Sequence, residues 1–405
     1  MFLEPLTRRN PAFLETVIRL HQEGRIRAAS YVLDLDTIEA NAAAIAAEAR
    51  RLGLTVFAMT KQLGRNPKAM ATLVAGGIDK FVAVDMTCAR TIHRHGFDLG
   101  HIGHLVQIPR AEVGEVASFG ADYWTLYNLE KAREASAACV RIGRRQNVLL
   151  RVHAPKDRFY SGHEGGFAVD ELPQAIAAIA AMPGLELAGI TTFPALLFDD
   201  DRKIVLPTHN LSTLERTAEA LRQVGLARVD VNAPGTNSLS VLQALADAGA
   251  TQVEPGHGLT GTTPLHAVHD LPERPSILYL SEVSHFHHGH AYFYGGGLYI
   301  DPIFPDYPLR ALVGADPETA LARRVPALIP PPSMIDYYGQ LDMAKHHDIR
   351  VGDTVVLGFR PQVFFTRAVV TPISGIASGK PVVEGIWTSD GRLEPGKEGQ
   401  SYDRS

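Results

Sequence analysis

One lysine in this sequence stands where its amine could attack a carbonyl group. Lys61 follows the apolar run Thr55–Met59 after a single residue. A lysine at the end of a buried strand is partly desolvated, which lowers the pKa of its amine and makes it a usable nucleophile. The alternative is an ordinary solvated lysine in a loop. Lys61 is therefore a candidate for Schiff-base formation.

Two short loops could present backbone N–H groups to a phosphate at close range, Gly235–Ser238 and Gly256–Gly258. Each loop alone could be an ordinary strand-to-helix turn, so their position after neighbouring strands is the stronger signal. Glu254 stands just before the second loop. An acid there could keep a pyridine nitrogen protonated and the ring an electron sink, although a salt-bridge role is the alternative.

The elements that must position these residues repeat a short β-branched or aromatic run, a loop and an Ala-rich amphipathic stretch. This alternation is typical of βα units, and eight strands indicate a closed (β/α)8 barrel. An open doubly wound sheet would show a Gly-rich fingerprint after its first strand, and none is present. The expected strands are Thr55–Met59, Lys80–Val84, His104–Ile108, Asp122–Leu126, Asn147–Val152, Glu186–Thr191, Arg228–Asn232 and Thr251–Glu254.

The stretch before the lysine strand predicts an amphipathic helix. Ile38, Ala42 and Ile45 fall on one helical face. Asp36 and Glu39 are placed as N-cap and capping-box partner. From about Pro272 the sequence changes to strand-like runs, Gly-rich turns and prolines, which indicates a separate β-domain. Its expected strands include Ser276–Val283, Ala291–Ile300, Thr354–Phe359 and Phe364–Val370.

Composition narrows the class of partner. The 405 residues are 45% hydrophobic and 20% charged with a net charge of −5, which is ordinary for a globular protein and predicts a small-molecule partner rather than nucleic acid. Cys88 and Cys139 are the two cysteines, too few for a disulfide framework. The N-terminal residues do not resemble a signal peptide, and no apolar run is long enough to span a membrane. We expect a cytoplasmic protein.

Two segments of the sequence resemble a known family. YVLDLDTIEAN and VFAMTKQLGRNP resemble the start of fold-type III pyridoxal-phosphate enzymes of the alanine racemase kind, and MTKQLGRNP is most similar to the YhfX-like branch. The resemblance implies a TIM-type barrel with a C-terminal mainly-β domain, pyridoxal 5′-phosphate as cofactor, an amino-acid substrate and a homodimer. In this family the first strand, here Tyr31–Leu35, joins the β-domain. The expected domains are therefore a barrel of residues 36–270, a β-domain of residues 1–35 and 271–390, and a flexible tail of residues 391–405.

The resemblance also implies roles for particular residues. Lys61 is the expected internal aldimine lysine. In the segment GHAYFYG, Tyr294 resembles the opposing catalytic tyrosine that is delivered across the dimer interface, with Tyr292 as the alternative. The other expected cofactor contacts are Arg151 and His153 near the ring and its phenolic oxygen, Phe193 against the ring, Glu254 at the ring nitrogen, and Gly235, Thr236, Ser238, Gly256 and His257 around the phosphate.

Two acidic residues depart from the alanine racemase pattern. Glu254 stands where alanine racemases carry Arg and is similar to the EPG motif of the family's decarboxylases, and Glu164 replaces the Arg of an Arg-Leu-Gly-Phe stretch. The expected function is an amino-acid racemase or epimerase that removes the Cα proton from an external aldimine. One alternative is a lyase, either a decarboxylase or an aldolase, although decarboxylases of this fold usually bring a cysteine from the β-domain. The other alternative is a non-catalytic pyridoxal-phosphate binding protein.

A run of histidines in the β-domain raises the question of a metal site. Imidazoles at alternating strand positions can share a face. The run lacks the Cys or paired Asp of the family's metal sites, so it is more typical of a substrate-lining or surface cluster, and no metal is predicted. The run comprises His285, His287, His288 and His290.

Overall fold

The computed structural model describes residues 1–395 except 224, 227–228, 300–307 and 332. The chain forms two compact units. The β-rich unit comprises Met1–Asn41, Lys61–Ala75 and Leu259–Ser405, and the barrel unit comprises Ala42–Thr60 and Gly76–Gly258. The predicted tail after residue 395 lies outside the described residues, as do Arg228 and Ile300, each at one end of an expected strand.

The barrel unit contains a parallel sheet that closes on itself, in the order β2-β13-β12-β9-β7-β6-β5-β4-β3. Phe57 alone separates β2 (Thr55–Val56) from β3 (Ala58–Met59), so these are two parts of one strand. That strand pairs with β13 through β2 and with β4 through β3, which confirms the predicted barrel. The other strands are β4 (Lys80–Ala83), β5 (Asp98–Ile102), β6 (Tyr123–Leu126), β7 (Gln146–His153), β9 (Leu185–Thr191), β12 (Asp230–Asn232) and β13 (Gln252–Val253).

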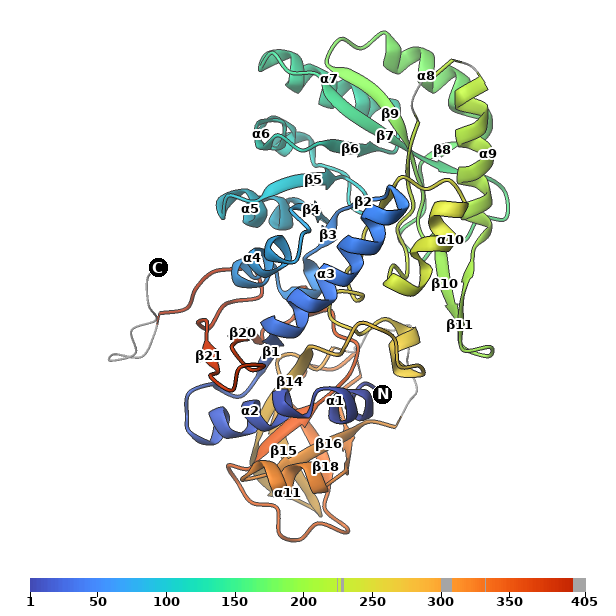
Figure 1. Cartoon of the computed structure of the whole chain (residues 1–405). Helices are drawn as coiled ribbons and strands as arrows, with labels where there is room; N and C mark the ends of the chain where they lie inside the picture. The colour runs from blue at the N-terminus through green and yellow to red at the C-terminus, as the bar shows by residue number, and fades with distance from the viewer. Residues whose placement is uncertain (224, 227–228, 300–307, 332, 396–405) are drawn as a thin grey trace. The chain divides into compact units, whose positions relative to one another are not determined.

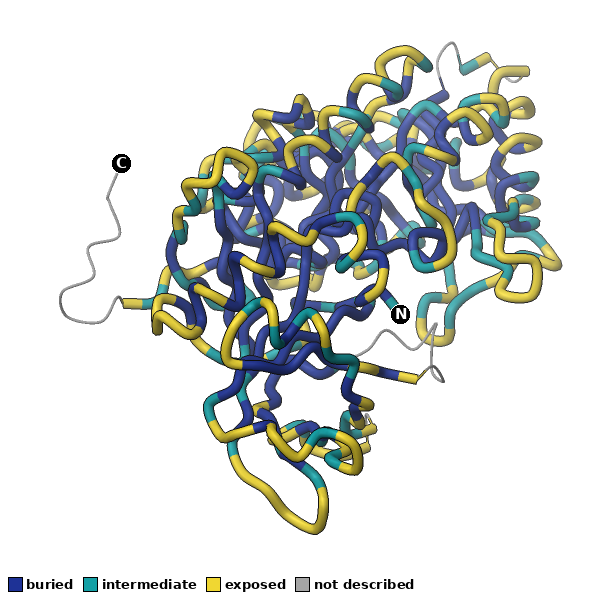
Figure 2. Tube along the Cα trace, turned by 60° about the horizontal axis from the view of Figure 1, so that its bottom comes forward, coloured by how far each residue is buried: buried dark blue, intermediate teal, exposed yellow. Residues whose placement is uncertain are grey.

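Helices alternate with the barrel strands and lie outside them (Figure 1). The strands are mostly buried, whereas the helices alternate between buried and exposed positions (Figure 2). Asp85 caps α5 by accepting a hydrogen bond from the N–H of Cys88 at 2.8 Å, which fixes the helix just after β4. The helices are α3 (Leu35–Leu52), α5 (Met86–Arg94), α6 (Val113–Phe119), α7 (Leu129–Arg141), α8 (Leu172–Ala180), α9 (His209–Gln223) and α10 (Leu242–Asp247). Further elements are β8 (Phe167–Ala168), which pairs with β7, the hairpin of β10 (Leu196–Asp199) and β11 (Ile204–Pro207), and the 3-10 turns η2 (Arg110–Glu112), η3 (Val169–Glu171) and η4 (Leu239–Val241).

One predicted barrel strand was wrong. The third strand is β5, Asp98–Ile102, and not His104–Ile108, which forms a loop. The true strand contains Gly100, where a Cβ would lie 2.4 Å from the Phe57 ring, so close packing requires glycine there. A strand with a glycine and a histidine inside it lacks the β-branched pattern used to predict strands, and the apolar run after it was taken instead.

The β-rich unit is built on a sheet of order β15-β18-β17-β16-β19-β14-β1-β20-β21. β1 (Ser30–Asp34) pairs antiparallel with β14 (Ile277–His287) and parallel with β20 (Val369–Ser374), so the first strand of the chain joins the C-terminal sheet as the resemblance implies. The other strands are β15 (His290–Tyr294), β16 (Arg310–Gly314), β17 (Val325–Leu328), β18 (Tyr338–Asp342), β19 (Thr354–Leu357) and β21 (Val382–Val383). The helices are α1 (Leu3–Arg9), α2 (Pro11–Gln22), α4 (Pro67–Ala75) and α11 (Pro317–Ala322), with the 3-10 turns η1 (Lys61–Leu63), η5 (Pro264–Ala267) and η6 (Val363–Phe365).

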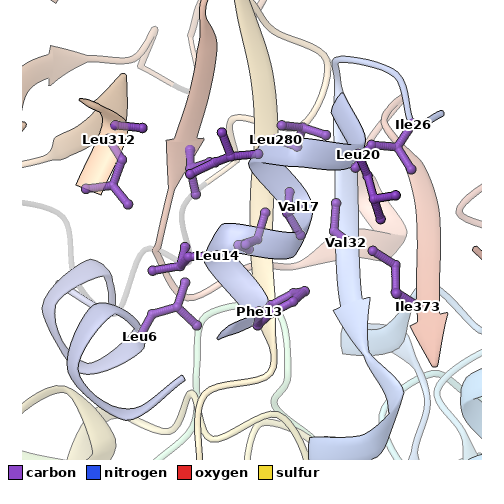
Figure 3. Packing of buried hydrophobic residues seen from close by; sticks show 14 of the residues in the cluster. Leu6, Phe13, Leu14, Val17, Leu20, Ile26, Val32, Leu280, Leu312 and Ile373 are labelled. Atoms are coloured by element: carbon purple, nitrogen blue, oxygen red, sulfur yellow. The ribbon is translucent and has the colours of Figure 1, made fainter. Parts of the chain in front are cut away.

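The core of the β-rich unit lies between α2 and this sheet. Leu14 and Val17 of α2 belong to one buried cluster with Val32 of β1 and Leu280 of β14 (Figure 3). The spacing of the α2 residues places them on one helical face. Burying such side chains contributes about 1.5–3 kcal/mol each, so the cluster fastens the N-terminal helix to the sheet.

Two local expectations need correction. The residue that caps α3 is Asp34, whose carboxylate accepts from the N–H of Thr37 at 3.2 Å. Asp36 instead accepts from the N–H groups of Gly375 and Ala377, because its carboxylate points to a turn of the β-rich unit. Residues 363–365 form η6 rather than the start of a strand. The predicted domain boundaries stay a prediction, and the compact units group residues 61–75 and 259–270 with the β-rich part.

Candidate active site

The predicted cofactor residues of the barrel unit all stand at or after the carboxyl ends of strands. Because the strands are parallel, these ends meet at one rim of the barrel. Arg151 and His153 close β7, and Phe193 comes two residues after β9. Gly235, Thr236 and Ser238 follow β12, and Glu254, Gly256 and His257 follow β13.

Hydrogen-bond donors from β5 and from the adjacent strand β12 surround Glu254. His101 Nδ1 lies 2.5 Å from Oε1 of Glu254, and Asn232 Nδ2 donates to the same oxygen at 3.0 Å. The other oxygen, Oε2, lies 3.8 Å from Nε2 of His104 and has no hydrogen-bond partner among the described residues, although it is buried. The carboxylate thus has one anchored oxygen and one that can still accept a hydrogen bond.

Glu254 is held as a buried anion. Burial by itself would raise its pKa, because a charged carboxylate loses its water. The nearby His104 and His101, together with the hydrogen bonds from His101 and Asn232, outweigh burial and lower the pKa below its ordinary value. The side chain is 1% exposed. A buried carboxylate with a free oxygen is suited to hold a positively charged N–H group.

Phe193 and Arg151 adjoin this cluster through His104. The rings of Phe193 and His104 meet edge to face with centroids 5.6 Å apart. Arg151 is fully buried, and its Nη1 donates to the hydroxyl of Tyr127 and, at 3.4 Å, to the carbonyl oxygen of His104. Its Nη2 donates to the carbonyl oxygen of His163 at 2.5 Å. Arg151 therefore fastens the loop after β7 to the barrel, and its Nε has no hydrogen-bond partner in the described part of the chain.

The two glycine-containing loops lie against each other. Gly235 has φ +140°, and a Cβ there would come within 3.0 Å of the main chain of Leu196. At Gly258 a Cβ would lie 2.5 Å from the carbonyl oxygen of Asn237. The side chain of Asn237 in turn accepts from the N–H of Glu254 at 2.8 Å, so it ties the first loop to the second. These close main-chain approaches explain why the loops need glycine.

Lys61 belongs to the β-rich unit, as the first residue of η1. Its Nζ lies 5.7 Å from the centroid of the Phe364 ring, and the guanidinium carbon of Arg65 lies 5.9 Å from the same ring. At Gly64, between these cations, a Cβ would come within 2.5 Å of Val370. The turn that carries Lys61 is therefore packed closely against η6 and β20.

Tyr294 ends β15 in the β-rich unit and is 38% exposed. It pairs with Tyr338 of β18, with ring centroids 5.9 Å apart. A cavity of about 670 Å³ is lined by Tyr294, Tyr337, Tyr338 and two arginines, Arg27 and Arg367, with neighbouring small residues. The alternative, Tyr292, is stacked on His285 at 4.6 Å instead. Of the two tyrosines, Tyr294 is the one that lines the cavity.

Four residues of the Glu254 cluster were missed by the sequence prediction: His101, His104, Thr125 and Asn232. His101 lies in β5 and His104 follows it by two residues, and β5 is the strand whose position was predicted wrongly. Recognising Asp98–Ile102 as that strand would have placed His101 near its carboxyl end, at the same rim of the barrel as Glu254. Among the described residues, ligand atoms of His101, His104 and Glu254 also lie close enough together to be considered for a metal ion.

Comparison with known proteins decides the family. Residues 33–264 match the family model described as alanine racemase, N-terminal domain, and residues 278–383 match that described as YhfX-like, C-terminal domain. The uncharacterized protein YhfX of Escherichia coli (strain K12) is 43% identical over 391 residues, which cover 96% of this chain and 99% of that protein. The chain belongs to the YhfX-like branch of the alanine racemase family.

Solved structures share the fold of this YhfX-like chain. D-threonine aldolase from Filomicrobium marinum superposes with a TM-score of 0.69 at 18% identity, covering 90% of this chain and 96% of that one. Alanine racemase of Clostridium difficile 630 in complex with cycloserine gives 0.64 at 16%, covering 89% and 98%. D-threo-3-hydroxyaspartate dehydratase from Delftia sp. HT23 gives 0.63 at 17%, covering 89% and 96%. The fold is thus that of the fold-type III pyridoxal-phosphate enzymes, in which several reactions occur.

None of the helices in the described ranges of this YhfX-like chain combines the length and the apolar character that a membrane span requires.

The histidine run lies on the hairpin of β14 and β15. His287 and His288 have ring centroids 4.0 Å apart.

Proposed function

We propose that this chain is a pyridoxal-phosphate-dependent amino-acid racemase or epimerase, with Lys61 as the cofactor lysine and Tyr294 as the opposed acid/base residue. The observation that carries the cofactor assignment is the buried Glu254 carboxylate, which keeps one oxygen free at the barrel rim. Membership of the alanine racemase family supports the same assignment.

The residues of the barrel rim fit pyridoxal 5′-phosphate. The free Oε2 of Glu254 can accept from a protonated ring nitrogen, because donors already saturate Oε1. The paired glycine loops around Gly235 and Gly256 bring main-chain N–H groups close together, as a phosphate requires. Phe193 would supply an apolar contact to the ring. When bound, the cofactor supplies an electron sink that acidifies the Cα–H bond of an amino acid.

Two residues would move protons in this proposal. The amine of Lys61 takes or returns the Cα proton on one side of the substrate, and the hydroxyl of Tyr294 serves the other side. Arg151 contributes by holding the loop after β7 in place through the carbonyl oxygen of His163. Inversion needs both proton-transfer groups, whereas exchange of the Cα hydrogen with solvent needs one.

The proposed active site is shared between two subunits. Lys61 can reach one side of a planar substrate adduct, so another element must serve the far side. Around Tyr294 the β-rich unit exposes Met334, Ile335 and Tyr337 by 68%, 66% and 63%. Large exposed apolar side chains of this kind mark interaction surfaces. We therefore propose a two-fold homodimer in which Tyr294 enters the partner's site.

The second candidate function is a lyase of the same fold, either an aldolase or a decarboxylase. The structural similarity to D-threonine aldolase and to a hydroxyaspartate dehydratase favours cleavage or elimination as the alternative to inversion. Both cysteines, Cys88 and Cys139, are buried in the barrel unit, so neither is available for the β-domain role that decarboxylases of this fold assign to cysteine. An aldolase is therefore the stronger lyase alternative.

The test is to incubate the purified protein and pyridoxal 5′-phosphate with single D- and L-amino acids in D₂O. Chiral chromatography measures inversion, NMR measures Cα deuteration, and assays for aldehyde and CO₂ measure cleavage. We expect deuterated D- and L-products from one amino acid without aldehyde or CO₂. Aldehyde release from a 3-hydroxy amino acid would assign the aldolase function instead, and activity retained in Lys61→Ala would overturn both.

A further inference from the structure

A chain of buried hydrogen bonds crosses the barrel interior and ends on the carboxylate of Glu254. Thr125 Oγ1 lies 2.6 Å from Nε2 of His101, and Nδ1 of His101 lies 2.5 Å from Oε1 of Glu254. On the other side, Thr191 Oγ1 donates to Oδ1 of Asn232 at 2.7 Å, and Nδ2 of Asn232 donates to Glu254. These residues come from β5, β6, β9, β12 and the end of β13.

Every residue in this series of hydrogen bonds is buried. His101, Thr125, Thr191 and Asn232 have no exposed surface, and Glu254 is 6% exposed as a whole residue. Buried polar groups in folded proteins are nearly always hydrogen bonded, because leaving one without a partner costs about 1–3 kcal/mol of stability. Within this group of residues, the carboxylate oxygen without a hydrogen-bond partner among the described residues is Oε2 of Glu254.

The hydrogen-bond roles follow from the partners. Asn232 must point its amide nitrogen at Glu254, because its oxygen accepts from the hydroxyl of Thr191. His101 must donate from Nδ1, because the carboxylate is ionised and can only accept. Its Nε2 then faces Thr125, whose hydroxyl can donate to a neutral imidazole. Two donors from separate strands thus fix Oε1, and the carboxylate cannot rotate without losing both.

A metal ion could instead occupy this cluster, because one ligand atom each of His101, His104 and Glu254 lies within 4.8 Å of the other two. Two ligands on a tetrahedral metal with bonds of about 2 Å are separated by about 3.3 Å. The 2.5 Å between His101 Nδ1 and Glu254 Oε1 is a hydrogen-bond distance and leaves no room for a shared ion. The hydrogen-bonded arrangement is therefore favoured over a metal site.

We propose that His101 is a positioning residue that holds the Glu254 carboxylate with Oε2 turned toward the protonated ring nitrogen of the cofactor. This inference rests on the proposed function and deepens it. His101 acts through Glu254, and Thr125 fixes the tautomer of His101. His104, the other titratable group beside Glu254, lies 3.8 Å from Oε2 and borders the same space.

The test uses pyridoxine 5′-phosphate, which cannot bond covalently to Lys61 and whose absorbance reports the protonation of its ring nitrogen. The wild-type protein, His101→Asn and His101→Leu are each titrated with pH in the presence of this probe. The amide of Asn can take the place of the Nδ1 donor, whereas Leu has no donor. We expect the ring-nitrogen pKa to fall by about one unit in His101→Leu, a tenfold loss of proton affinity, and by clearly less in His101→Asn.

A second measurement needs no substitution of His101. In the cofactor-free protein with ¹⁵N-labelled histidine, the Nδ1–H proton of His101 should give a strongly downfield signal that moves in Glu254→Gln. Absence of that signal, an unchanged ring pKa in His101→Leu, or equal falls in both His101 variants would overturn the positioning role. Displacement of the signal by micromolar Zn²⁺ would assign a metal site instead.

The outcomes separate this inference from the proposed function. Should the wild-type protein bind no pyridoxine 5′-phosphate, the cofactor assignment fails and the role of His101 fails with it, even with the downfield signal present. Should the probe bind and the ring pKa respond to His101 while no amino acid is inverted or cleaved, the positioning role stands and the reaction assignment fails.

Discussion

Two buried titratable groups, Glu254 in the barrel unit and His21 in the β-rich unit, respond to burial in opposite ways. In the barrel unit, donors surround Glu254 and its pKa is lowered despite burial, so the charge is retained. In the β-rich unit, burial lowers the pKa of His21 to about 4, which favours its neutral form at neutral pH, and burial also raises the pKa of its neighbour Glu282. His21 bonds to the hydroxyl of Thr354 at 2.8 Å, and its Nε2 lies 3.3 Å from Glu282.

This contrast compares a buried group that can serve stability alone with one that we propose to serve chemistry. Burial alone disfavours a charge, and the fold need only leave the group neutral, as at His21. Retaining a buried charge requires dedicated partners, which His101 and Asn232 provide for Glu254. Strongly perturbed groups with such partners cluster at functional sites. The predictions below test each side of the contrast.

The largest expected effect is on Lys61, because the proposed function requires its amine to hold the cofactor. Borohydride treatment of the protein with pyridoxal 5′-phosphate should fix the label on the peptide containing Lys61. Lys61→Ala should lose the visible absorbance of the lysine-bound cofactor and at least about 10³-fold in activity. Lys68→Ala changes a nearby, partly exposed lysine that is paired with Glu384; it is the matched control and should keep both. Label on another lysine would contradict the assignment.

Tyr294 tests whether the β-rich unit contributes chemistry as well as stability. Tyr294→Phe removes a proton donor, so inversion should fall by about 10²–10⁴-fold in both directions. Exchange of the Cα hydrogen with D₂O should persist for the antipode that faces Lys61, as measured by NMR. Tyr292→Phe is the control, because that ring stacks on His285 and its loss of a hydroxyl should change little.

Several results would contradict this role of Tyr294. Normal inversion in Tyr294→Phe, or full activity of a strictly monomeric form in sedimentation, would remove the shared site. Equal loss of exchange for both antipodes would make Tyr294 a cofactor-positioning residue, with Tyr292 the next candidate for the second base.

Glu254→Gln tests the retained charge directly and should have a smaller effect. Gln keeps the shape and can still accept from one donor, but it cannot balance a positive ring nitrogen. We expect turnover to fall by about 10–100-fold while the phosphate loops still bind the cofactor, as checked by equilibrium dialysis. Turnover equal to that of the wild type would show that Glu254 has a structural role, like His21.

The sequence predicted the barrel because its strands follow a local rule. The runs around Thr55–Met59 and Asn147–Val152 are apolar on both faces and lie at regular intervals, as a barrel requires. The strand ends then predicted the rim residues Arg151 and Glu254. Asp98–Ile102 broke the rule, since Gly100 is dictated by the Phe57 ring, a contact distant in sequence.

The partners of Glu254 could not be predicted for a related reason. His101 and Asn232 are 153 and 22 residues away from Glu254, so their hydrogen bonds depend on the closure of the barrel and on strand register. Likewise, Asp36 is a good N-cap by sequence, but a turn at residues 375–377 binds its carboxylate instead. Spacing predicts which residues reach the rim, whereas tertiary packing decides which of them pair.

The smallest expected effect is on stability and concerns His21. Its pKa is about 4 in the folded protein, against an ordinary value of about 6.5 in the unfolded chain. Between these values the unfolded chain binds more protons, so the contribution of His21 to stability is complete above pH 6.5 and is lost as the pH falls toward 4. This lowering of the pKa corresponds to roughly 3 kcal/mol of stability. His21→Asn keeps a donor beside Thr354 but cannot titrate, so the free energy of unfolding of this variant should decline less over this pH range.

Urea unfolding of the wild-type protein and of His21→Asn at several pH values measures the difference between their free energies of unfolding, in which the opposing contribution of Glu282 largely cancels. Parallel declines in the two proteins would show that His21 is already charged in the fold, and the contrast between the two units would then be lost.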